Sequence, residues 1–358
     1  MKLLYVTNGI NGSGGLERVL SIKASYLADK YGYEVVILCL NNGHKDPFYT
    51  FSDKIKMLSI AVCGNPLTYV RSYSKGIKNI VDTIKPDIIS VCDDGLKGFL
   101  IPKIVGSKKP IIYERHASIE LDKTKGLANT IKRKLMQKLA ADFTAFIVLT
   151  KSNLNEWTSN NLVCIPNPLT FYPATSSTLN SKIVIFVGSQ SHNKGVDLLL
   201  LAWQEVIKKF PDWKLSFYGK GHHDLKYENL STKLEVGQTV FFNGPVQNIE
   251  EKYLESALMV LPSRSEGFGM VLIEAMACGV PCVSFDCPSG PRDIIQDAVD
   301  GYLVPAEEVA VLALKIMDLM ADEEKRLLFG KRAKQNVKRF LPDVIVGQWD
   351  TLFNKIIK

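Results

Sequence analysis

The sequence lacks the features that identify several large classes of protein. It contains no apolar run of the ~18–20 residues that a membrane-spanning helix requires. Residues 1–15 (MKLLYVTNGINGSGG) start with an apolar run too short for a secretory signal peptide and offer no cleavage site, so they predict a first buried strand. Heptads and short repeats are also absent, which excludes coiled coils and solenoids.

Cysteine is scarce and follows no pattern. The seven cysteines lie mostly inside apolar segments, their number is odd, and no C-x-x-C pair occurs. This usage predicts free thiols in a reducing cytoplasm. Cys278, Cys282 and Cys287 are close in sequence, but their spacing is not that of a zinc site and no histidine is near.

A nicotinamide-binding fingerprint is missing as well. Lys2–Thr7 predicts a strand, Asn8–Gly15 (NGINGSGG) a glycine-rich loop, and Leu16–Lys30 a helix. The loop does not read G-x-G-x-x-G, and no acidic residue is placed to bind a nicotinamide ribose. This pattern disfavours a dehydrogenase.

The sequence does contain enough apolar material for two folded domains. Its 358 residues are 46% hydrophobic, and a chain of this length exceeds one compact core. A strand, a polar loop and a helix recur at Lys182–Val187, Gly188–Lys194 and Gly195–Phe210. Residues 169–181 (LTFYPATSSTLNS), rich in Ser, Thr and Pro, are the expected linker. The sequence therefore predicts an α/β protein with two similar halves.

The charge is uneven between these halves. Residues 1–170 hold 23 Lys and Arg against 14 Asp and Glu, a net charge of +9, whereas residues 171–358 hold 21 against 23, a net charge of −2. A basic first half is compatible with an anionic membrane, nucleic acid or an anionic substrate.

The most informative stretch runs from residue 261 to 295 (LPSRSEGFGMVLIEAMACGVPCVSFDCPSGPRDII). Glu266 and Glu274 are separated by seven residues, and Val271–Cys278 is apolar enough for a buried helix that ends at Gly279. The amides at the start of this helix have no partners within it, so they can bind a phosphate or a developing negative charge. A carboxylate on either side could hold sugar hydroxyls.

This stretch resembles the paired-glutamate motif of the GT4 family of retaining glycosyltransferases, which have the GT-B fold. The matching positions are Ser263, Glu266, Gly267, Phe268, Gly269, Glu274, Ala275, Ala277, Gly279 and Pro281. The alternative is a buried helix in which Glu274 makes only a structural hydrogen bond. That alternative is disfavoured because an unpaired buried carboxylate is costly.

The resemblance implies a domain organisation. Two Rossmann-like domains would face each other across a deep cleft, with residues 1–170 binding the acceptor and residues 171–341 binding the nucleotide-sugar. The last helix, about 342–358, would pack back on the first domain through Trp349 and Phe353.

The resemblance also assigns roles to single residues. The catalytic residues would be Glu266, His116 and Lys194. The donor-binding residues would be Gly14, Gly15, Lys194, Val246, Glu266, Gly267, Phe268, Gly269, Met270, Val271 and Glu274. Glu17, Arg18 and Asp94 are assigned to the acceptor. In this set Lys194 would bind the diphosphate, Glu266 the transferred sugar and Glu274 the ribose. A structural role remains the alternative for Glu17, Arg18 and His116.

The sequence departs from the family at one diphosphate contact. The family loop reads G-R-x-x-x-x-K-G, and here Ser189 stands where the arginine is expected. His192 or Lys220 would have to take over part of the arginine's contact with the diphosphate, and Arg18 or Arg264 could bind phosphates.

A metal-binding D-x-D sequence is also missing, and the adjacent Asp93-Asp94 pair is a weak substitute. Fixed cations and a helix N-terminus can neutralise a diphosphate without metal. We therefore expect neither a metal nor another cofactor.

Residues 124–141 predict a basic amphipathic helix. Its apolar stripe consists of Leu127, Ile131, Leu135 and Leu139, and its basic residues are Lys125, Lys132, Arg133, Lys134 and Lys138. Such a helix can lie on an anionic membrane, or it can be a solvated helix packed on its domain. Both alternatives hold if the apolar stripe packs inward and the lysines face lipid. The absence of interleaved aromatic residues argues against nucleic acid.

These observations predict a cytoplasmic enzyme, peripheral on the inner membrane face. It would move a hexose or N-acetylhexosamine from a nucleoside diphosphate sugar, UDP-linked rather than GDP-linked, to a lipid-linked glycan of a bacterial O-antigen, capsule or exopolysaccharide. A second enzyme hypothesis is a soluble transferase with a small sugar as acceptor. A third is a catalytically silent GT-B subunit that binds a glycan or a partner enzyme, which Ser189 alone supports.

Overall fold

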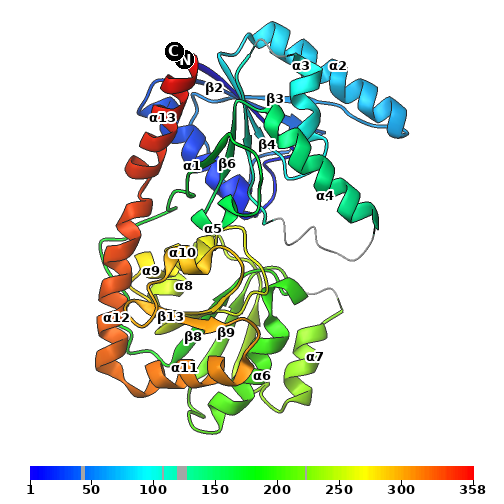
Figure 1. Cartoon of the computed structure of the whole chain (residues 1–358). Helices are drawn as coiled ribbons and strands as arrows, with labels where there is room; N and C mark the ends of the chain where they lie inside the picture. Colours follow the sequence, from blue (N-terminus) through cyan, green and yellow to red (C-terminus); the bar gives the residue numbers. More distant parts are fainter. Residues whose placement is uncertain (42–44, 107–108, 119–126, 222–223) are drawn as a thin grey trace. The chain divides into compact units, whose positions relative to one another are not determined.

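The computed structural model describes residues 1–41, 45–106, 109–118, 127–221 and 224–358 (Figure 1). These residues form two compact units by their internal contacts. Unit 1 comprises Met1–Thr170 together with Pro342–Lys358, and unit 2 comprises Phe171–Leu341. Each unit is an α/β fold built on its own parallel sheet.

Unit 1 contains a seven-stranded sheet in the order β3-β2-β1-β4-β5-β6-β7, in which all paired neighbours are parallel. The strands are β1 (Lys2–Thr7), β2 (Glu34–Leu40), β3 (Lys56–Ile60), β4 (Ile88–Cys92), β5 (Ile111–Glu114), β6 (Ala145–Val148) and β7 (Leu162–Cys164). The helices are α1 (Gly15–Asp29), α2 (Pro66–Ile84), α3 (Ile101–Val105), α4 (Leu127–Leu139), α5 (Lys151–Leu154) and α13 (Pro342–Ile357).

Unit 2 contains a six-stranded parallel sheet in the order β10-β9-β8-β11-β12-β13. The strands are β8 (Ile183–Val187), β9 (Lys214–Tyr218), β10 (Val240–Asn243), β11 (Leu258–Leu261), β12 (Cys282–Asp286) and β13 (Gly301–Pro305). The helices are α6 (Val196–Ile207), α7 (Lys226–Lys233), α8 (Ile249–Leu254), α9 (Met270–Ala277), α10 (Pro291–Ile294), α11 (Val309–Ala321) and α12 (Glu323–Asn336).

The central strands read as apolar runs because helices cover both faces of a parallel sheet. Every residue of β4 and of β11 is buried, and so are five of the six residues of β1. The predicted class, two Rossmann-like α/β domains, is confirmed.

The strand order reverses once in each sheet, between β1 and β4 in unit 1 and between β8 and β11 in unit 2. Open α/β sheets bind ligands at the carboxyl ends of the strands beside such a reversal. In unit 1 the register pairs Thr7 with Cys92, so the loops that follow β1 and β4 start side by side. In unit 2 the loops after β8 and β11 have the same relation.

Helix α13 packs on α1 within unit 1, and Figure 1 shows the two side by side. Trp349 and Phe353 of α13 are buried, with exposed fractions of 3% and 0%. Tyr33, which follows α1, donates a hydrogen bond to Asp350 at 2.6 Å. The end of the chain thereby contributes to the core of unit 1.

Two elements of unit 1 have bounds that were not part of the sequence interpretation. Helix α2 begins at Pro66, because Asn65 caps it by accepting the Thr68 amide at 3.0 Å and proline suits the first helical position. The short strand β3 was not predicted, because its residues are all exposed or half-buried and form no apolar run.

The predicted apolar stripe of the basic helix is wrong in part. In α4, Leu139 is buried, but Ile131 and Leu135 are 58% and 41% exposed. The packed face is instead formed by Met136 and Leu139 with Ala140 after the helix, and all three belong to the core of unit 1. Lys125 lies outside the described residues. Within the described ranges, no helix combines the length and hydropathy needed to span a membrane.

Candidate active site

The paired-glutamate motif occupies the loop after β11 and the first turns of α9. We call residues 262–269 the β11 loop and residues 188–195 the β8 loop. Glu266 of the β11 loop is 7% exposed, and its Oε1 accepts hydrogen bonds from Lys194 Nζ and Ser263 Oγ, both at 2.6 Å. Its backbone carbonyl oxygen accepts a hydrogen bond from Ser289 Oγ at 2.7 Å. The Glu266 carboxylate is therefore fixed at one edge by a cation and a hydroxyl.

The β8 and β11 loops are in direct contact. The Arg264 amide donates to the Asn193 carbonyl at 2.8 Å, and Asn193 Nδ2 donates to the Ser265 carbonyl at 3.0 Å. Gly195 has φ +66°, and a Cβ there would lie 1.8 Å from the carbonyl oxygen of Pro262. Only glycine permits this approach, which brings Lys194 to Glu266.

Helix α9 starts one residue earlier than expected, at Met270, with Gly269 (φ +101°) as its N-cap. A glycine cap has no side chain to satisfy the first-turn amides, so these amides and the helix dipole suit an anion. Phe268 is buried against Phe340, with ring centroids 5.5 Å apart, and this contact holds the β11 loop in place.

Glu274 lies inside α9 and is fully buried. The Tyr253 hydroxyl lies 3.4 Å from its Oε2. The carboxylate thus has a polar partner within unit 2. The assignment of Glu274 to a ribose stays a prediction.

The other donor positions of unit 2 lie around these loops. Gly267 and Val271 flank the start of α9, and Val246 follows β10, where it is partly exposed.

Ser189, which stands where the family has an arginine, is exposed, with its Oγ 3.4 Å from Ser191 Oγ. His192 and Lys220 are exposed as well. The Arg264 guanidinium group is bound by Asp197, Glu307 and the His192 carbonyl. It is therefore not a free cation in this structure, and its assignment to phosphates stays a prediction.

In unit 1 the predicted catalytic histidine belongs to a buried network that the sequence did not reveal. Glu114, the last residue of β5, forms an ion pair with Lys23 of α1, and both side chains are 1% exposed. Ser90 donates to Glu114 Oε1 at 2.6 Å, and His116 Nε2 lies 3.4 Å from Oε2. Burial alone would raise the pKa of Glu114, but Lys23 and His116 outweigh it and lower that pKa to about 2.

Helix α13 also contributes to this network. The Lys23 ammonium group lies 4.1 Å from the centroid of the Trp349 ring and 5.0 Å from that of Tyr5. Aromatic faces stabilise a cation that has lost its water. The sequence carried one signal of this role: Lys23 falls on the apolar face of α1, four residues before Leu27.

One cluster in the described part of the chain has ligand atoms close enough for a metal ion. These are Cys92, Glu114 and His116, whose atoms lie within 4.8 Å of one another. The Lys23 ammonium group already neutralises Glu114, and burial raises the pKa of the Cys92 thiol well above its usual value. Both effects disfavour a divalent ion, so the residues fit an ion pair better than a metal site.

Of the predicted acceptor residues, Glu17 and Arg18 lie in the first turn of α1, and Asp94 lies on the loop after β4. The Glu17 carboxylate folds back over the glycine loop, so a Cβ at Gly14 would lie 2.5 Å from its oxygen. The Arg18 guanidinium lies 5.0 Å from the ring centroid of Tyr49. Gly15 is the first residue of α1, and a Cβ there would meet open space.

Asp94 has a role that was not anticipated. Its Oδ1 accepts the backbone amides of His116 at 3.0 Å and Ala117 at 3.3 Å. Arg115 Nη1 donates to the Asp94 carbonyl at 2.8 Å. Asp94 therefore holds the loop that carries His116, and its assignment to the acceptor remains a prediction.

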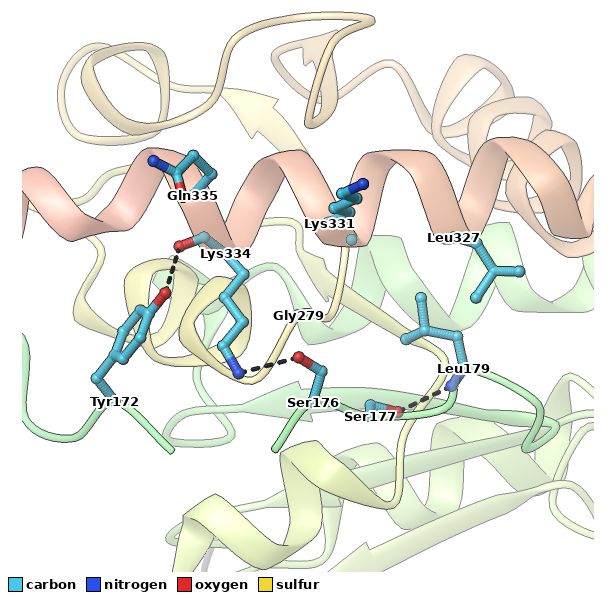
Figure 2. A pocket seen from close by; sticks show the side chains of 10 residues that line it. Tyr172, Ser176, Ser177, Leu179, Gly279, Leu327, Lys331, Lys334 and Gln335 are labelled. Carbon is cyan, nitrogen blue, oxygen red and sulfur yellow. Dashed lines mark hydrogen bonds between the residues drawn. The ribbon is translucent and has the colours of Figure 1, made fainter. Parts of the chain in front are cut away.

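A cavity of about 340 Å³ in unit 2 is lined by none of the predicted site residues (Figure 2). It lies between the linker and α12. Lys334 of α12 donates to the Pro173 carbonyl and to Ser176 Oγ, both at 2.9 Å, and to the Thr175 carbonyl. The Tyr172 hydroxyl donates to the Lys334 carbonyl at 3.2 Å. These bonds tie the linker to α12.

Comparisons with known proteins agree with the fold and the motif. Residues 173–336 match the family described as glycosyl transferases group 1, and residues 15–151 match the family described as glycosyl transferase 4-like. The chain belongs to these GT4-like glycosyltransferases, which have the GT-B fold.

Individual relatives cover the whole chain. The amylovoran biosynthesis glycosyltransferase AmsD of Erwinia amylovora is 29% identical over 369 residues, 99% of each chain. GalNAc-alpha-(1->4)-GalNAc-alpha-(1->3)-diNAcBac-PP-undecaprenol alpha-1,4-N-acetyl-D-galactosaminyltransferase of Campylobacter jejuni is 27% identical over 369 residues, also 99% of each chain. Among solved structures, the sucrose-phosphate synthase of Thermosynechococcus elongatus is similar in fold, with a TM-score of 0.85 at 18% identity, covering 99% of this chain and 98% of that one.

Proposed function

We propose that this glycosyltransferase is a retaining, metal-independent enzyme. It moves a hexose or N-acetylhexosamine from a nucleoside diphosphate sugar, a UDP-sugar in preference to a GDP-sugar, to a lipid-linked glycan of a bacterial surface polysaccharide. The observation that carries this proposal is the Glu266 carboxylate, held by Lys194 and Ser263 beside the start of α9. This arrangement offers a cation and bare amides to a diphosphate and a carboxylate to a sugar.

The proposed reaction breaks the bond between the anomeric carbon and the diphosphate oxygen and forms a bond from that carbon to the acceptor hydroxyl oxygen. The acceptor proton passes to the leaving diphosphate oxygen, and attack on the same face retains the anomeric configuration. Lys194 and the first-turn amides of α9 stabilise the negative charge that develops on the leaving group. Glu266 orients the transferred sugar, and Glu274 is assigned to the ribose.

The acceptor proposal rests on relatives and on charge. One relative is named for amylovoran biosynthesis and another for transfer to a glycan on diphospho-undecaprenol. Residues 1–170, expected to bind the acceptor, carry a net charge of +9. A lipid diphosphate is anionic, so a basic acceptor domain suits it.

The membrane proposal rests on one face of α4. Ile131 and Leu135 are exposed, and Lys134 and Lys138 are exposed on the same face at helical spacing. Apolar side chains enter the headgroup region while lysines meet anionic lipid, which is how interfacial helices bind. On this proposal the enzyme is cytoplasmic and peripheral on the inner membrane face.

The function is tested by incubating the purified protein with a panel of UDP- and GDP-sugars, with and without a synthetic lipid-diphosphate glycan. We expect slow donor hydrolysis alone, faster transfer with the lipid acceptor, an α-linked product from an α-linked donor, and no loss of rate in EDTA. Transfer to free sugars but not to the lipid would support the small-sugar alternative. A protein that binds no nucleotide and turns over no donor would be a silent subunit. Inactivation by EDTA, reversed by added metal, would contradict the metal-free mechanism.

Membrane contact is tested by flotation with liposomes that contain anionic lipid. The variant with Lys132, Arg133, Lys134 and Lys138 changed to Gln, and the variant I131S/L135S, should each stay in the soluble fraction. A matched control changes Lys54, Lys56, Lys85 and Lys103 of the same unit to Gln and should float like the wild type. Equal flotation of all variants would refute the α4 surface.

A further inference from the structure

Three segments of unit 2 converge on the side chain of Arg264. Its Nη1 and Nη2 donate to the two carboxylate oxygens of Asp197 at 2.9 and 2.8 Å, in the bidentate geometry that makes arginine–carboxylate pairs strong. Its Nε donates to Glu307 Oε2 at 3.0 Å, and Nη1 also donates to the His192 carbonyl. The side chain is 16% exposed.

These contacts surround the turn that carries Lys194. Arg264 binds the His192 carbonyl at the start of the short 3-10 turn His192–Lys194. It also binds Asp197 in the first turn of α6, which follows that turn. The backbone of Arg264 binds the same turn, since its amide donates to the Asn193 carbonyl at 2.8 Å. One residue therefore holds the turn from both of its ends.

The charge states agree with a strong pair. Partial burial would raise the pKa of Asp197, but hydrogen bonds from Arg264 outweigh it and lower that pKa. The pKa of Arg264 is raised by its hydrogen bonds to Asp197 and then to Glu307. Both groups are thus ionised across the physiological range.

We infer that Arg264 is a positioning residue, which with Asp197 fixes the turn 192–194 and thereby holds the Lys194 ammonium group against Glu266. Ser189 replaces the arginine of the family pattern, so Lys194 is the one lysine or arginine of the β8 loop. A site with a single loop cation depends more on where that cation lies. The inference rests on the proposed function for what Lys194 binds.

The test compares R264K, D197N and the double variant R264K/D197N with a matched control. The control is K325Q, which removes the ion pair of Lys325 with Asp318 (3.0 Å) elsewhere in unit 2. UDP affinity is measured by calorimetry, and KM for the donor and kcat by transfer assays. We expect each single variant to weaken UDP binding by up to about 10- to 100-fold, which is the effect of losing one hydrogen bond to a charged group. The double variant should bind UDP no more weakly than the weaker-binding single variant, and K325Q should bind UDP like the wild type.

The two variants separate positioning from a direct phosphate contact. If Arg264 bound the diphosphate itself, D197N would free the guanidinium group and would maintain or tighten UDP binding. That result would overturn the inference. So would variants that lose thermal stability while their folded fraction keeps the wild-type UDP affinity and donor KM, because that pattern marks a role in stability alone.

Hydrogen exchange of the amides of residues 192–196 gives a readout that needs no activity. R264K and D197N should exchange these amides faster than the wild type, and K325Q should not. Unchanged exchange in R264K and D197N would refute positioning. If exchange accelerates as expected but the wild type binds no nucleotide, the proposed function fails while the positioning role stands.

Discussion

The Lys194 ammonium nitrogen lies 2.6 Å from Oε1 of Glu266, the same oxygen that Ser263 reaches at 2.6 Å. A diphosphate that approaches Lys194 competes with Glu266 for the ammonium protons. On the proposed mechanism, donor binding therefore loosens one of two restraints on Glu266, and Ser263 keeps the other. The ion pair prepares both groups before the donor arrives.

The first prediction concerns the cation. Lys194→Met should weaken UDP binding about 10- to 100-fold, because a hydrogen bond to a charged group contributes about 1.5–3 kcal/mol. Calorimetry with UDP measures this directly. Lys208→Met is the control, since Lys208 is exposed at the end of α6 and pairs only with Glu205 among the ion pairs described. Equal affinity of the Lys194 variant and the control would contradict the assignment.

The second prediction separates orientation from binding at Glu266. Glu266→Gln should lower kcat about 10²–10³-fold, the size seen when one preorganised electrostatic contact is removed. Ser263→Ala should lower kcat by about tenfold and leave UDP affinity within twofold, because the hydroxyl orients only the carboxylate. Ser231→Ala, which removes a hydroxyl bonded to the Glu228 carbonyl at 2.7 Å, is the control. A Ser263 variant that loses UDP affinity but keeps kcat would reverse these roles.

The third prediction concerns the buried pair of unit 1. Glu114→Gln leaves the Lys23 charge uncompensated and should lower the free energy of unfolding by about 3–5 kcal/mol at pH 7. K23M/E114L removes both charges, so it should recover most of this loss. Urea unfolding with tryptophan fluorescence measures both.

The pair of Glu114 and Lys23 also makes the free energy of unfolding depend on pH. The pKa of Glu114 falls from 4.5 to about 2 on folding, so the unfolded state binds more protons between these values. The stabilisation is complete above pH 4.5 and is lost as the pH falls through about 2. The difference between the wild type and Glu114→Gln should therefore narrow over this window. A constant difference from pH 7 to pH 2.5 would contradict it.

The fourth prediction concerns the linker. Lys334→Met removes the donor that serves Pro173, Thr175 and Ser176, so it should destabilise unit 2 by about 1–3 kcal/mol and speed hydrogen exchange of the linker amides. UDP affinity should not change, because none of these residues belongs to the candidate site. Lys331→Met, an exposed neighbour on the same helix, is the control. Equal effects of the two variants would show that Lys334 does not pin the linker.

Local pattern was sufficient for the architecture and for the motif. Apolar runs that alternate with helical periodicity predict parallel sheets because both faces of such strands are buried. The glycines and glutamates of 266–274 form a contiguous segment, so their spacing already describes the loop and helix that carry them. The start of α2 could also have been predicted from the sequence, since Asn65 is a typical N-cap and Pro66 a typical first-turn residue.

Other features depend on partners far apart in sequence. Lys23 and Glu114 are 91 residues apart, and Arg264 and Asp197 are 67 apart. Lys23 reaches Glu114 because α1 packs on the sheet that contains β5. Arg264 reaches Asp197 because the loops after β8 and β11 start side by side in their sheet. Asp94 likewise became a support for the His116 loop through the pairing of β4 with β5.

The sequence by itself determined the class of fold, the paired glutamates and the lysine that follows β8, because each depends on residues close together in the chain. Tertiary structure alone decided that Lys194 pairs with Glu266, that Arg264 holds a turn instead of offering a free cation, and that Ile131 and Leu135 remain exposed on α4. The physical reason is that burial and ion pairing depend on which segments pack together, and periodicity within a segment does not specify its partner.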